Sequence, residues 1–402
     1  MTALATAAAL RLPAVLGTMT IGPGAQLSTV ESGAALVERF VAWPGHAEGA
    51  AVHLDTARMY DGGNTETRLG EILGATPGLG GGRTTFASKA NPWGAGTAAK
   101  ALTAASVDAQ MAASLEALRA ESVEIYYLHA PDTTTPILET LQAVDALHKA
   151  GKFKRFGLSN YQAWEVAHIH GLCKRHGFVL PTVYQGMLNY LTRDVHRELF
   201  PCLRQLGMGF YAYNPLAGGL LTGKHTDRAK LAEGAPKGSR FDASNKMYRE
   251  RCVEEGVLVL VPLLLVPLLL VPLLLVPLLL VPLLLPLLLL RYHLTPLRYL
   301  REAQLDATDL ALAACKKHSV DPAAAAIRWV TTHSGMGASL GDAIIVGASS
   351  IAHLDANLEA CLATEPLHDD IIAAMDSAWD VVKGHGACPS YERGFSLCAP
   401  EL

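Results

Sequence analysis

The 402-residue sequence has few charged and few aromatic residues, 17% and 6%, and its mean hydropathy is +0.24. Its seven cysteines are widely spaced and form no CxxC pair, which argues against a disulfide scaffold or a zinc ribbon. No polybasic run occurs, and a net charge of −4 offers no basic surface to nucleic acid or anionic lipid. The N-terminus lacks the basic and continuous apolar regions of a secretory signal. We therefore expect a cytoplasmic protein, with organellar import left open.

One low-complexity segment accounts for much of the hydropathy. Residues 257–290 contain only Leu, Val and Pro, and VPLLL occurs five times in succession from Val261. The apolar length would span a bilayer, but six prolines, each lacking a backbone donor, disfavour a membrane helix. A disordered extended loop, an expanded simple repeat or a translated intervening sequence are the alternatives. Without this segment the hydrophobic share falls from 50% to about 47%, the ordinary globular range.

Elsewhere, short apolar runs alternate with longer amphipathic ones. The expected strands are Ala14–Gly17, Ala51–Leu54, Thr84–Ser88, Val123–Leu128, Lys154–Leu158, Thr182–Tyr184, Gly209–Tyr213 and Ala343–Val346. Helices are expected over Val107–Ala120, Pro136–Gly151 and Asp309–His318, among others. This alternation predicts a closed (β/α)8 TIM barrel. A doubly wound open sheet is the alternative, but its GxGxxG fingerprint is missing after the first strand.

The expected fold divides the chain into three parts. Residues 1–10 form a short N-terminal extension, residues 11–251 and 299–402 form a single barrel, and residues 252–298 form the low-complexity insert. The insert would lie in the loop after the seventh strand. The flanking sequences MYRER and YLRE would join into one plausible helix if the insert were removed.

Polar residues or glycine follow almost every expected strand. In a TIM barrel, catalytic groups lie at the carboxyl ends of the strands. The residues at those positions are Asp55, Lys89, His129, Ser159, Asn160, Gln185, Tyr213, Asn214 and Gly347. A lone Asp there is more often a helix cap, and a lone His is usually a core residue. All of these residues together predict a single functional site at the carboxyl ends of the strands.

Tyr60, five residues after Asp55, adds a proton donor to that site. A tyrosine has an ordinary pKa of about 10, so it donates a proton at neutral pH only where positive charge lowers that value. Lys89 can supply the charge, and Asp55 can hold Lys89 as an ion pair. His129 can orient a substrate carbonyl by hydrogen bonding. Reduction of that carbonyl would also need a hydride, which a nicotinamide cofactor provides.

These residues lie in phrases that resemble the aldo-keto reductase family. HLDTARMYDGGNTETRLGEIL at residues 53–73 is similar to the family signature. FASKANPW, YYLHAPD, FGLSNY, YQGMLNYLTR, FYAYNPLAGGLLTGK and DAIIVGASSIAHLDANL continue the likeness in order. YNPLAGGLLTGK and CPSYERG look most like the aflatoxin aldehyde reductase and succinic semialdehyde reductase branch.

The resemblance implies NADPH-dependent reduction of small acidic or aromatic aldehydes to alcohols, without a metal. It makes Tyr60 the general acid, with Asp55, Lys89 and His129 as its partners. The cofactor contacts that it implies are Ser159, Asn160, Gln185, Tyr213, Asn214, Leu216, Gly218, Gly219, Lys224, Arg240, Gly347, Ser349, Ser350, His353 and Asn357. The implied substrate contacts are His129, Tyr248, Arg251 and Arg393, with Arg298 as the alternative to Arg251.

The resemblance also divides the cofactor contacts by role. Ser159, Asn160 and Gln185 would bind the nicotinamide amide, and Tyr213 would stack on the nicotinamide face. Residues 214–224 would wrap the pyrophosphate, and residues 347–357 would lie at the adenosine end. Many family members have Lys and Arg where Gly347 and His353 stand here, and a neutral His is a weaker phosphate ligand. The family suggests a homodimer, and the alternative function is a slow-turnover regulatory subunit resembling channel beta subunits.

Overall fold

The computed structural model describes residues 11–47, 49–76, 78–79, 83–93, 102–224, 226–228, 302–363 and 365–384. Its strands are β1 (Ala14–Gly17), β2 (Val52–Asp55), β3 (Thr84–Ala90), β4 (Val123–Leu128), β5 (Phe153–Ser159), β6 (Pro181–Met187), β7 (Gly209–Tyr213) and β8 (Ala343–Gly347). They pair in sequence order, every pairing is parallel, and β8 pairs with β1 to close the ring. This confirms the (β/α)8 TIM barrel and excludes the open sheet.

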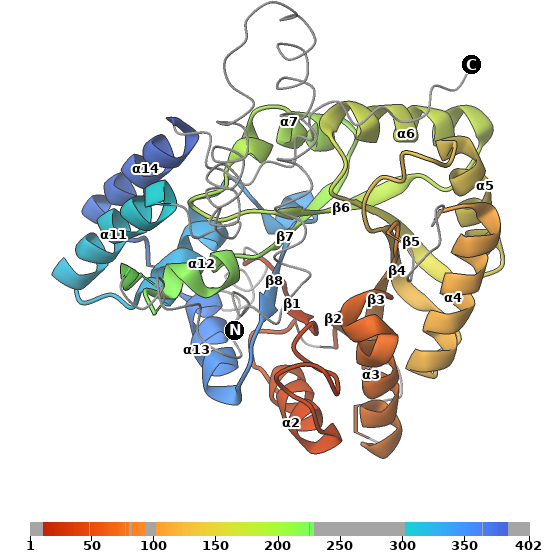
Figure 1. Ribbon diagram of the computed structural model, residues 1–402, viewed down its shortest axis with the longest axis horizontal. Coiled ribbons are helices and arrows are strands. Elements are labelled where there is room, and N and C mark those ends of the chain that lie inside the picture. Colours follow the sequence, from red (N-terminus) through yellow and green to blue (C-terminus); the bar gives the residue numbers. More distant parts are fainter. Residues whose placement is uncertain are drawn as a thin grey trace, which may run out of the picture.

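Helices surround the barrel (Figure 1). They are α2 (Val30–Val41), α3 (Asn64–Ala75), α4 (Ala104–Leu118), α5 (Ile137–Lys149), α6 (Ala163–His176), α7 (Leu199–Gln205), α11 (Glu302–Lys317), α12 (Pro322–Thr332), α13 (Ile351–Leu362) and α14 (Asp369–Gly384). Local sequence sets their starts: the Thr29 side chain caps α2, and Asp321 caps α12 ahead of Pro322. None of the described helices is long and apolar enough to cross a membrane.

The expected strand bounds are correct for β1, β4 and β7. Strands β3, β5, β6 and β8 run further than the sequence predicts, and β2 is shifted by one residue. In β3, Lys89 pairs with Tyr127 and Ala90 pairs with Leu128, so Lys89 lies inside the strand rather than after it. Strand β4 continues to Leu128, so its backbone groups pair with Lys89 and Ala90, the two extra residues of β3. The length of a strand here depends on its neighbour as well as on its own residues.

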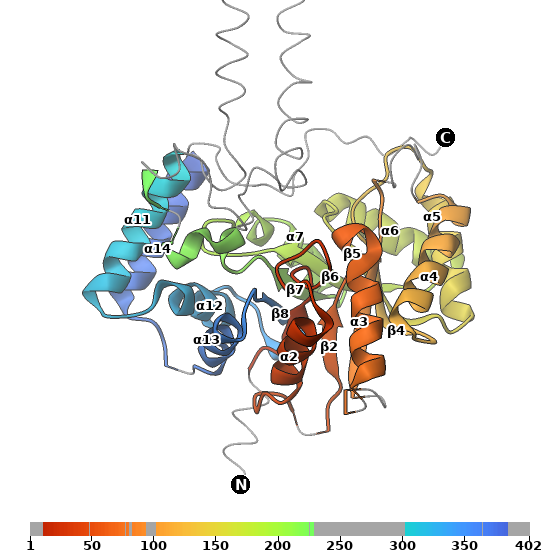
Figure 2. The same ribbon diagram turned by 60° about the horizontal axis from the view of Figure 1, so that its bottom comes forward.

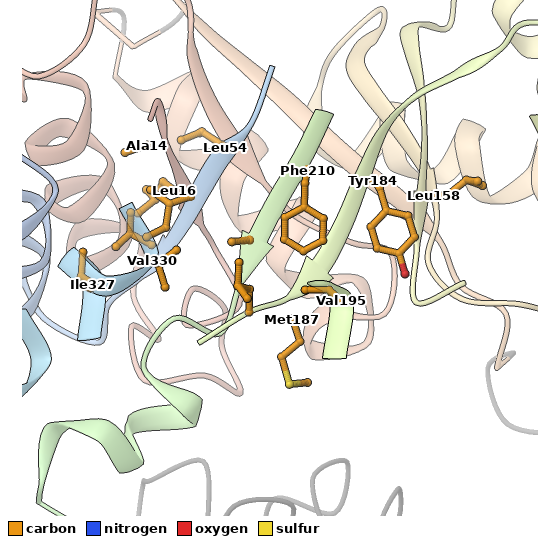
Figure 3. Close-up of a cluster of buried hydrophobic side chains, with 14 of the residues drawn as sticks. Ala14, Leu16, Leu54, Leu158, Tyr184, Met187, Val195, Phe210, Ile327 and Val330 are labelled. Atoms are coloured by element: carbon orange, nitrogen blue, oxygen red, sulfur yellow. The ribbon is translucent and has the colours of Figure 1, made fainter. Parts of the chain in front are cut away.

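Alternation of side chains along the strands produces two apolar layers. The inward layer fills the barrel and consists of Val15, Ala87, Ile125, Tyr127, Val183, Tyr211, Ala343 and Ile345. Outward side chains such as Leu16, Leu54 and Phe210 pack under the helices, where Ile327 and Val330 of α12 join them (Figure 3). Since successive side chains point to opposite faces of a strand, the alternation also determines which residues near the carboxyl ends point into the barrel. Those positions hold buried polar groups.

The described chain stops at Arg228, after β7, and resumes at Glu302, the first residue of α11. Arg228 joins these two points through its guanidinium: Nε donates to Glu302 Oε1 at 2.7 Å. Its other nitrogens donate to Asp306 at 2.5 Å and to Asp309 at 2.8 Å. The chain therefore leaves and rejoins the described barrel at one place. The expected extension at residues 1–10 and the insert at residues 252–298 lie outside the described residues.

Deletion of residues 252–298 is expected to leave the barrel folded, because the Arg228 contacts already hold its two sides together. Even for a flexible loop of this length, the shortening would change the free energy of unfolding by only about 1 kcal/mol. The thermal midpoint should then move by no more than about 4 °C, measured by circular dichroism on both chains. A deletion variant that is insoluble, or far less stable, would contradict this expectation.

Candidate active site

Asp55 and Lys89 form a buried ion pair at the carboxyl end of the barrel. Lys89 Nζ lies 2.7 Å from Asp55 Oδ2 and donates to the backbone oxygen of Thr56 at 2.8 Å. The Lys89 side chain has no exposed surface. Burial lowers the pKa of Lys89, but the adjacent Asp55 carboxylate and the Tyr60 side chain raise it above the ordinary value of 10.5. The ammonium is therefore held as a cation inside the barrel.

Tyr60 approaches this cation from the loop after β2. It begins the short helix η1 (Tyr60–Gly63), and its hydroxyl oxygen lies 3.4 Å from Lys89 Nζ. The Lys89 nitrogen lies 5.0 Å from the centroid of the Tyr60 ring. The next residue, Asp61, has a left-handed φ of 47° and accepts the Gly24 backbone N–H at 2.9 Å. This contact ties the turn that carries Tyr60 to the loop after β1.

His129 follows β4 and completes the group of four. Its ring centroid lies 6.0 Å from that of Tyr60, and the two rings meet edge to face. The Trp93 ring contacts His129 in a similar way at 5.2 Å. His129 is 7% exposed, while Trp93 is 44% exposed. An imidazole and a phenol thus meet beside a buried cation and an exposed indole.

Gln185 connects β6 to the ion pair. Its Nε2 donates to Asp55 Oδ1 at 2.8 Å, so both oxygens of Asp55 accept hydrogen bonds. The family resemblance implies that Gln185 contacts the nicotinamide amide, and this bond was not predicted from the sequence. In the structure, Gln185 orients the carboxylate that holds Lys89.

The ends of β5 and β7 are also linked. Asn160, with a left-handed φ of 62°, donates from Nδ2 to the Ser159 hydroxyl at 3.1 Å and to the His129 backbone oxygen at 2.8 Å. The Tyr213 hydroxyl donates to Asn160 Oδ1 at 2.8 Å. The three expected nicotinamide contacts Ser159, Asn160 and Tyr213 therefore form one hydrogen-bonded group next to His129.

The loop after β7 is tightly coiled. Left-handed φ angles recur along it, at Asn214, Ala217, Gly218, Gly219 and Gly223. Asn214 Oδ1 accepts the Gly218 N–H at 3.0 Å, and the Leu216 oxygen accepts the Gly219 N–H at 2.8 Å. Asn189 donates to the Asn214 backbone oxygen at 3.1 Å and fixes the start of the loop. The N–H groups of Gly218 and Gly219 therefore donate within the loop itself, and the glycines leave its turns without side chains.

The N-terminus of α13 lies beside the loop after β7. The Ser350 hydroxyl caps it by accepting the His353 N–H at 3.2 Å. Lys224, from the loop after β7, lies 3.3 Å from His353 Nε2. With Lys224 donating to Nε2, His353 carries its proton on Nδ1 and donates to the Ser349 hydroxyl at 3.2 Å. A cationic side chain therefore stands beside a helix N-terminus, an arrangement that favours phosphate.

Gly347 and Asn357 join the end of β8 to α13. Gly347 is the last residue of β8 and pairs with Gly17 of β1, so neither strand places a side chain there. Asn357 of α13 is 5% exposed and donates to the Gly347 oxygen at 3.3 Å. The expected adenosine contacts in the described chain thus meet around the start of α13.

The remaining expected contacts lie outside the described residues; they are Arg240, Tyr248, Arg251, Arg393 and the alternative Arg298. Trp93, which ends the phrase FASKANPW and contacts His129, was not predicted from the sequence. An aromatic residue shortly after a strand that carries a catalytic candidate is a usable signal for it.

A buried Asp–Lys pair, with Tyr and His beside it at the carboxyl end of a (β/α)8 barrel, is the arrangement expected of a barrel oxidoreductase that reduces carbonyl groups. The sequence comparison agrees: residues 13–380 match the Aldo/keto reductase family, and the chain belongs to that family. Family members generally use NAD(P)H, and the enzyme class is therefore an NAD(P)-dependent oxidoreductase that acts on small molecules.

Relatives with known names cover almost the whole chain. It is 40% identical over 389 residues to aflatoxin B1 aldehyde reductase member 2 of Homo sapiens, with 95% of this chain and 90% of the relative covered. It is 37% identical over 379 residues to member 4 from the same organism, with 94% and 96% covered. An aldo-keto reductase of Pseudocercospora fijiensis is 35% identical over 341 residues, with 84% and 95% covered.

Proposed function

We propose that the protein reduces small acidic or aromatic aldehydes to alcohols with NADPH as the reductant. The observation that carries this proposal is the Tyr60 hydroxyl 3.4 Å from the buried Lys89 cation. Aldehyde substrates are also suggested by the names of the aflatoxin B1 aldehyde reductases to which the chain is similar. When bound, the nicotinamide supplies the hydride.

Tyr60 donates the proton to the carbonyl oxygen. Lys89 stabilises the negative charge that develops on the phenolic oxygen as the proton leaves, and Asp55 keeps Lys89 in place. Gln185 holds the second oxygen of Asp55 and so limits rotation of the carboxylate. His129, beside Tyr60, hydrogen-bonds to the carbonyl oxygen and orients it toward the phenol.

The loops that surround this group would hold the cofactor. The capped N-terminus of α13, with Lys224 beside it, would suit a phosphate of a dinucleotide. The glycines of residues 214–224 would let the backbone approach the pyrophosphate closely, with Lys224 as its cation. Ser159, Asn160 and Gln185 would bind the nicotinamide amide, and Tyr213 would stack on the nicotinamide face. Gly347, Ser349, Ser350, His353 and Asn357 would hold the adenosine end.

Steady-state oxidation of NADPH in the presence of succinic semialdehyde or 4-nitrobenzaldehyde tests the function. We expect turnover with at least one of them, and the Tyr60→Phe chain serves as the inactive control. Tight NADPH binding with negligible turnover on both aldehydes would instead support the regulatory-subunit alternative.

Sedimentation analysis and cell fractionation would test the further proposals of a homodimer and a cytoplasmic location, which rest on family likeness and composition.

His353→Arg is expected to raise the preference for NADPH over NADH. Arginine is always charged and pairs with phosphate through two donors, whereas His353 here accepts a hydrogen bond from Lys224. A new charge-assisted contact of about 1.5–3 kcal/mol would increase the ratio of kcat/KM for the two cofactors by about 10- to 100-fold.

Lys224→Met is the companion variant, and it should weaken both cofactors because their pyrophosphate is the same. Initial rates at varied NADPH and NADH measure both effects. If His353→Arg changed the two cofactors equally, His353 would not lie at the phosphate that distinguishes them.

A further inference from the structure

Two histidines and an aspartate meet on the outer side of the barrel, between α11 and α14. Figure 1 and Figure 2 both show these helices side by side. His318 directly follows α11, while His368 directly precedes α14 and Asp370 lies in its first turn. One potential ligand atom from each of the three lies within 4.8 Å of the others. The cluster comes from two segments about fifty residues apart that the fold brings together.

The side chains already face one another. His318 Nε2 lies 2.9 Å from Asp370 Oδ2, and the rings of His318 and His368 stack with centroids 3.8 Å apart at 26°. The Asp370 backbone N–H donates to His368 Nδ1 at 3.1 Å, which gives His368 a capping role at the start of α14. That capping bond does not require a second imidazole stacked against the first. The stacked arrangement therefore brings a nitrogen of each ring and a carboxylate oxygen within 4.8 Å of one another.

We propose that His318, His368 and Asp370 form a binding site for a divalent transition-metal cation, with Zn²⁺ as the best match. Two imidazole nitrogens and one carboxylate oxygen are a donor set that suits Zn²⁺, Ni²⁺ and Cu²⁺ and not Mg²⁺ or Ca²⁺, which prefer oxygen ligands. Water would complete a four-coordinate site. In the structure a hydrogen bond joins His318 to Asp370, and the metal replaces it when it binds.

Lys317 is the internal competitor for this site. Its Nζ lies 2.5 Å from the same Asp370 oxygen that contacts His318. The Lys317 side chain is 68% exposed, so it can move into water when a doubly charged ion takes its place. The bound metal would then tie the end of α11 to the start of α14. This site uses none of the residues assigned to aldehyde reduction.

Calorimetric titration of the untagged full chain with ZnCl₂ tests the proposal. We expect one Zn²⁺ to bind per chain. His318→Ala and His368→Ala should each lower the Zn²⁺ affinity by more than about 10- to 100-fold, the loss seen when only an outer partner of a ligand is removed. His168→Ala is the matched control, because it removes an exposed histidine from α6. Its Zn²⁺ affinity should equal that of the unaltered chain.

Lys317→Met separates a metal site from a purely structural contact. It removes the competing cation, so a metal site predicts tighter Zn²⁺ binding, by about two- to fivefold, which corresponds to the loss of one exposed ion pair. Co²⁺ bound in place of Zn²⁺ should show the visible absorption of a tetrahedral site, and Mg²⁺ should not compete. The proposal fails if Lys317→Met does not tighten Zn²⁺ binding, or if His318→Ala and His368→Ala bind Zn²⁺ as the unaltered chain does.

Discussion

Tyr60→Phe is expected to lower kcat for aldehyde reduction by about 10²- to 10⁴-fold, the range that general acid catalysis contributes. Phenylalanine keeps the ring that meets His129 edge to face, but it removes the hydroxyl 3.4 Å from Lys89. The fold and the cofactor loops are therefore unchanged, and only proton donation is lost. Cofactor affinity should stay within about threefold, since no cofactor contact assigned above involves the hydroxyl.

Single-turnover rates with NADPH, together with NADPH titration, separate these two effects. His129→Gln is the informative companion because it keeps a hydrogen-bond donor while it changes the ring. If Tyr60→Phe retained the full rate, the proton would come from another group, and His129 would be the first to examine. A parallel loss of NADPH binding would instead place Tyr60 in the cofactor site.

Lys89→Met is expected to remove activity and also to destabilise the barrel by about 3–5 kcal/mol, the cost of breaking a buried ion pair. Asp55 is 3% exposed, and without Lys89 its carboxylate would lose the cation 2.7 Å away. The pKa of Lys89 in the folded protein lies above its ordinary value of 10.5. Its stabilising contribution is therefore fully present below pH 10.5 and is lost only as the pH rises through the folded value.

Urea unfolding at neutral pH measures this effect. The double variant Asp55→Asn with Lys89→Met removes both charges, so it should recover part of the lost stability while activity stays absent. Gln185 can still donate to the amide oxygen of an asparagine at position 55. A double variant no more stable than Lys89→Met alone would show that the ion pair is not the source of the loss.

The barrel itself could be predicted from the sequence because its signal is local. Apolar runs such as Val123–Leu128 and Gly209–Tyr213 have the bounds expected for them. The closeness of Asp55, Tyr60, Lys89 and His129 followed from the rule that carboxyl ends of parallel strands share one face. Neither inference required knowledge of a particular side-chain contact.

Contacts between distant residues could not be predicted in this way. The bond from Gln185 to Asp55 joins residues 130 positions apart, and the approach of Lys224 to His353 joins two separate loops. Both depend on the orientation of side chains after the ring has closed. The residue types alone left Gln185 with several potential partners, and only the closed barrel selects one.

The Arg228 contacts have a consequence for changes in chain length. The Arg228 side chain contacts Glu302, Asp306 and Asp309 of α11, so two points of the described chain that are far apart in the sequence lie together at the surface. A change in chain length between two points that are already held together need not move either of them, so we expect the barrel to tolerate it. The same position is a suitable place to insert a foreign domain, such as a fluorescent reporter, into the barrel.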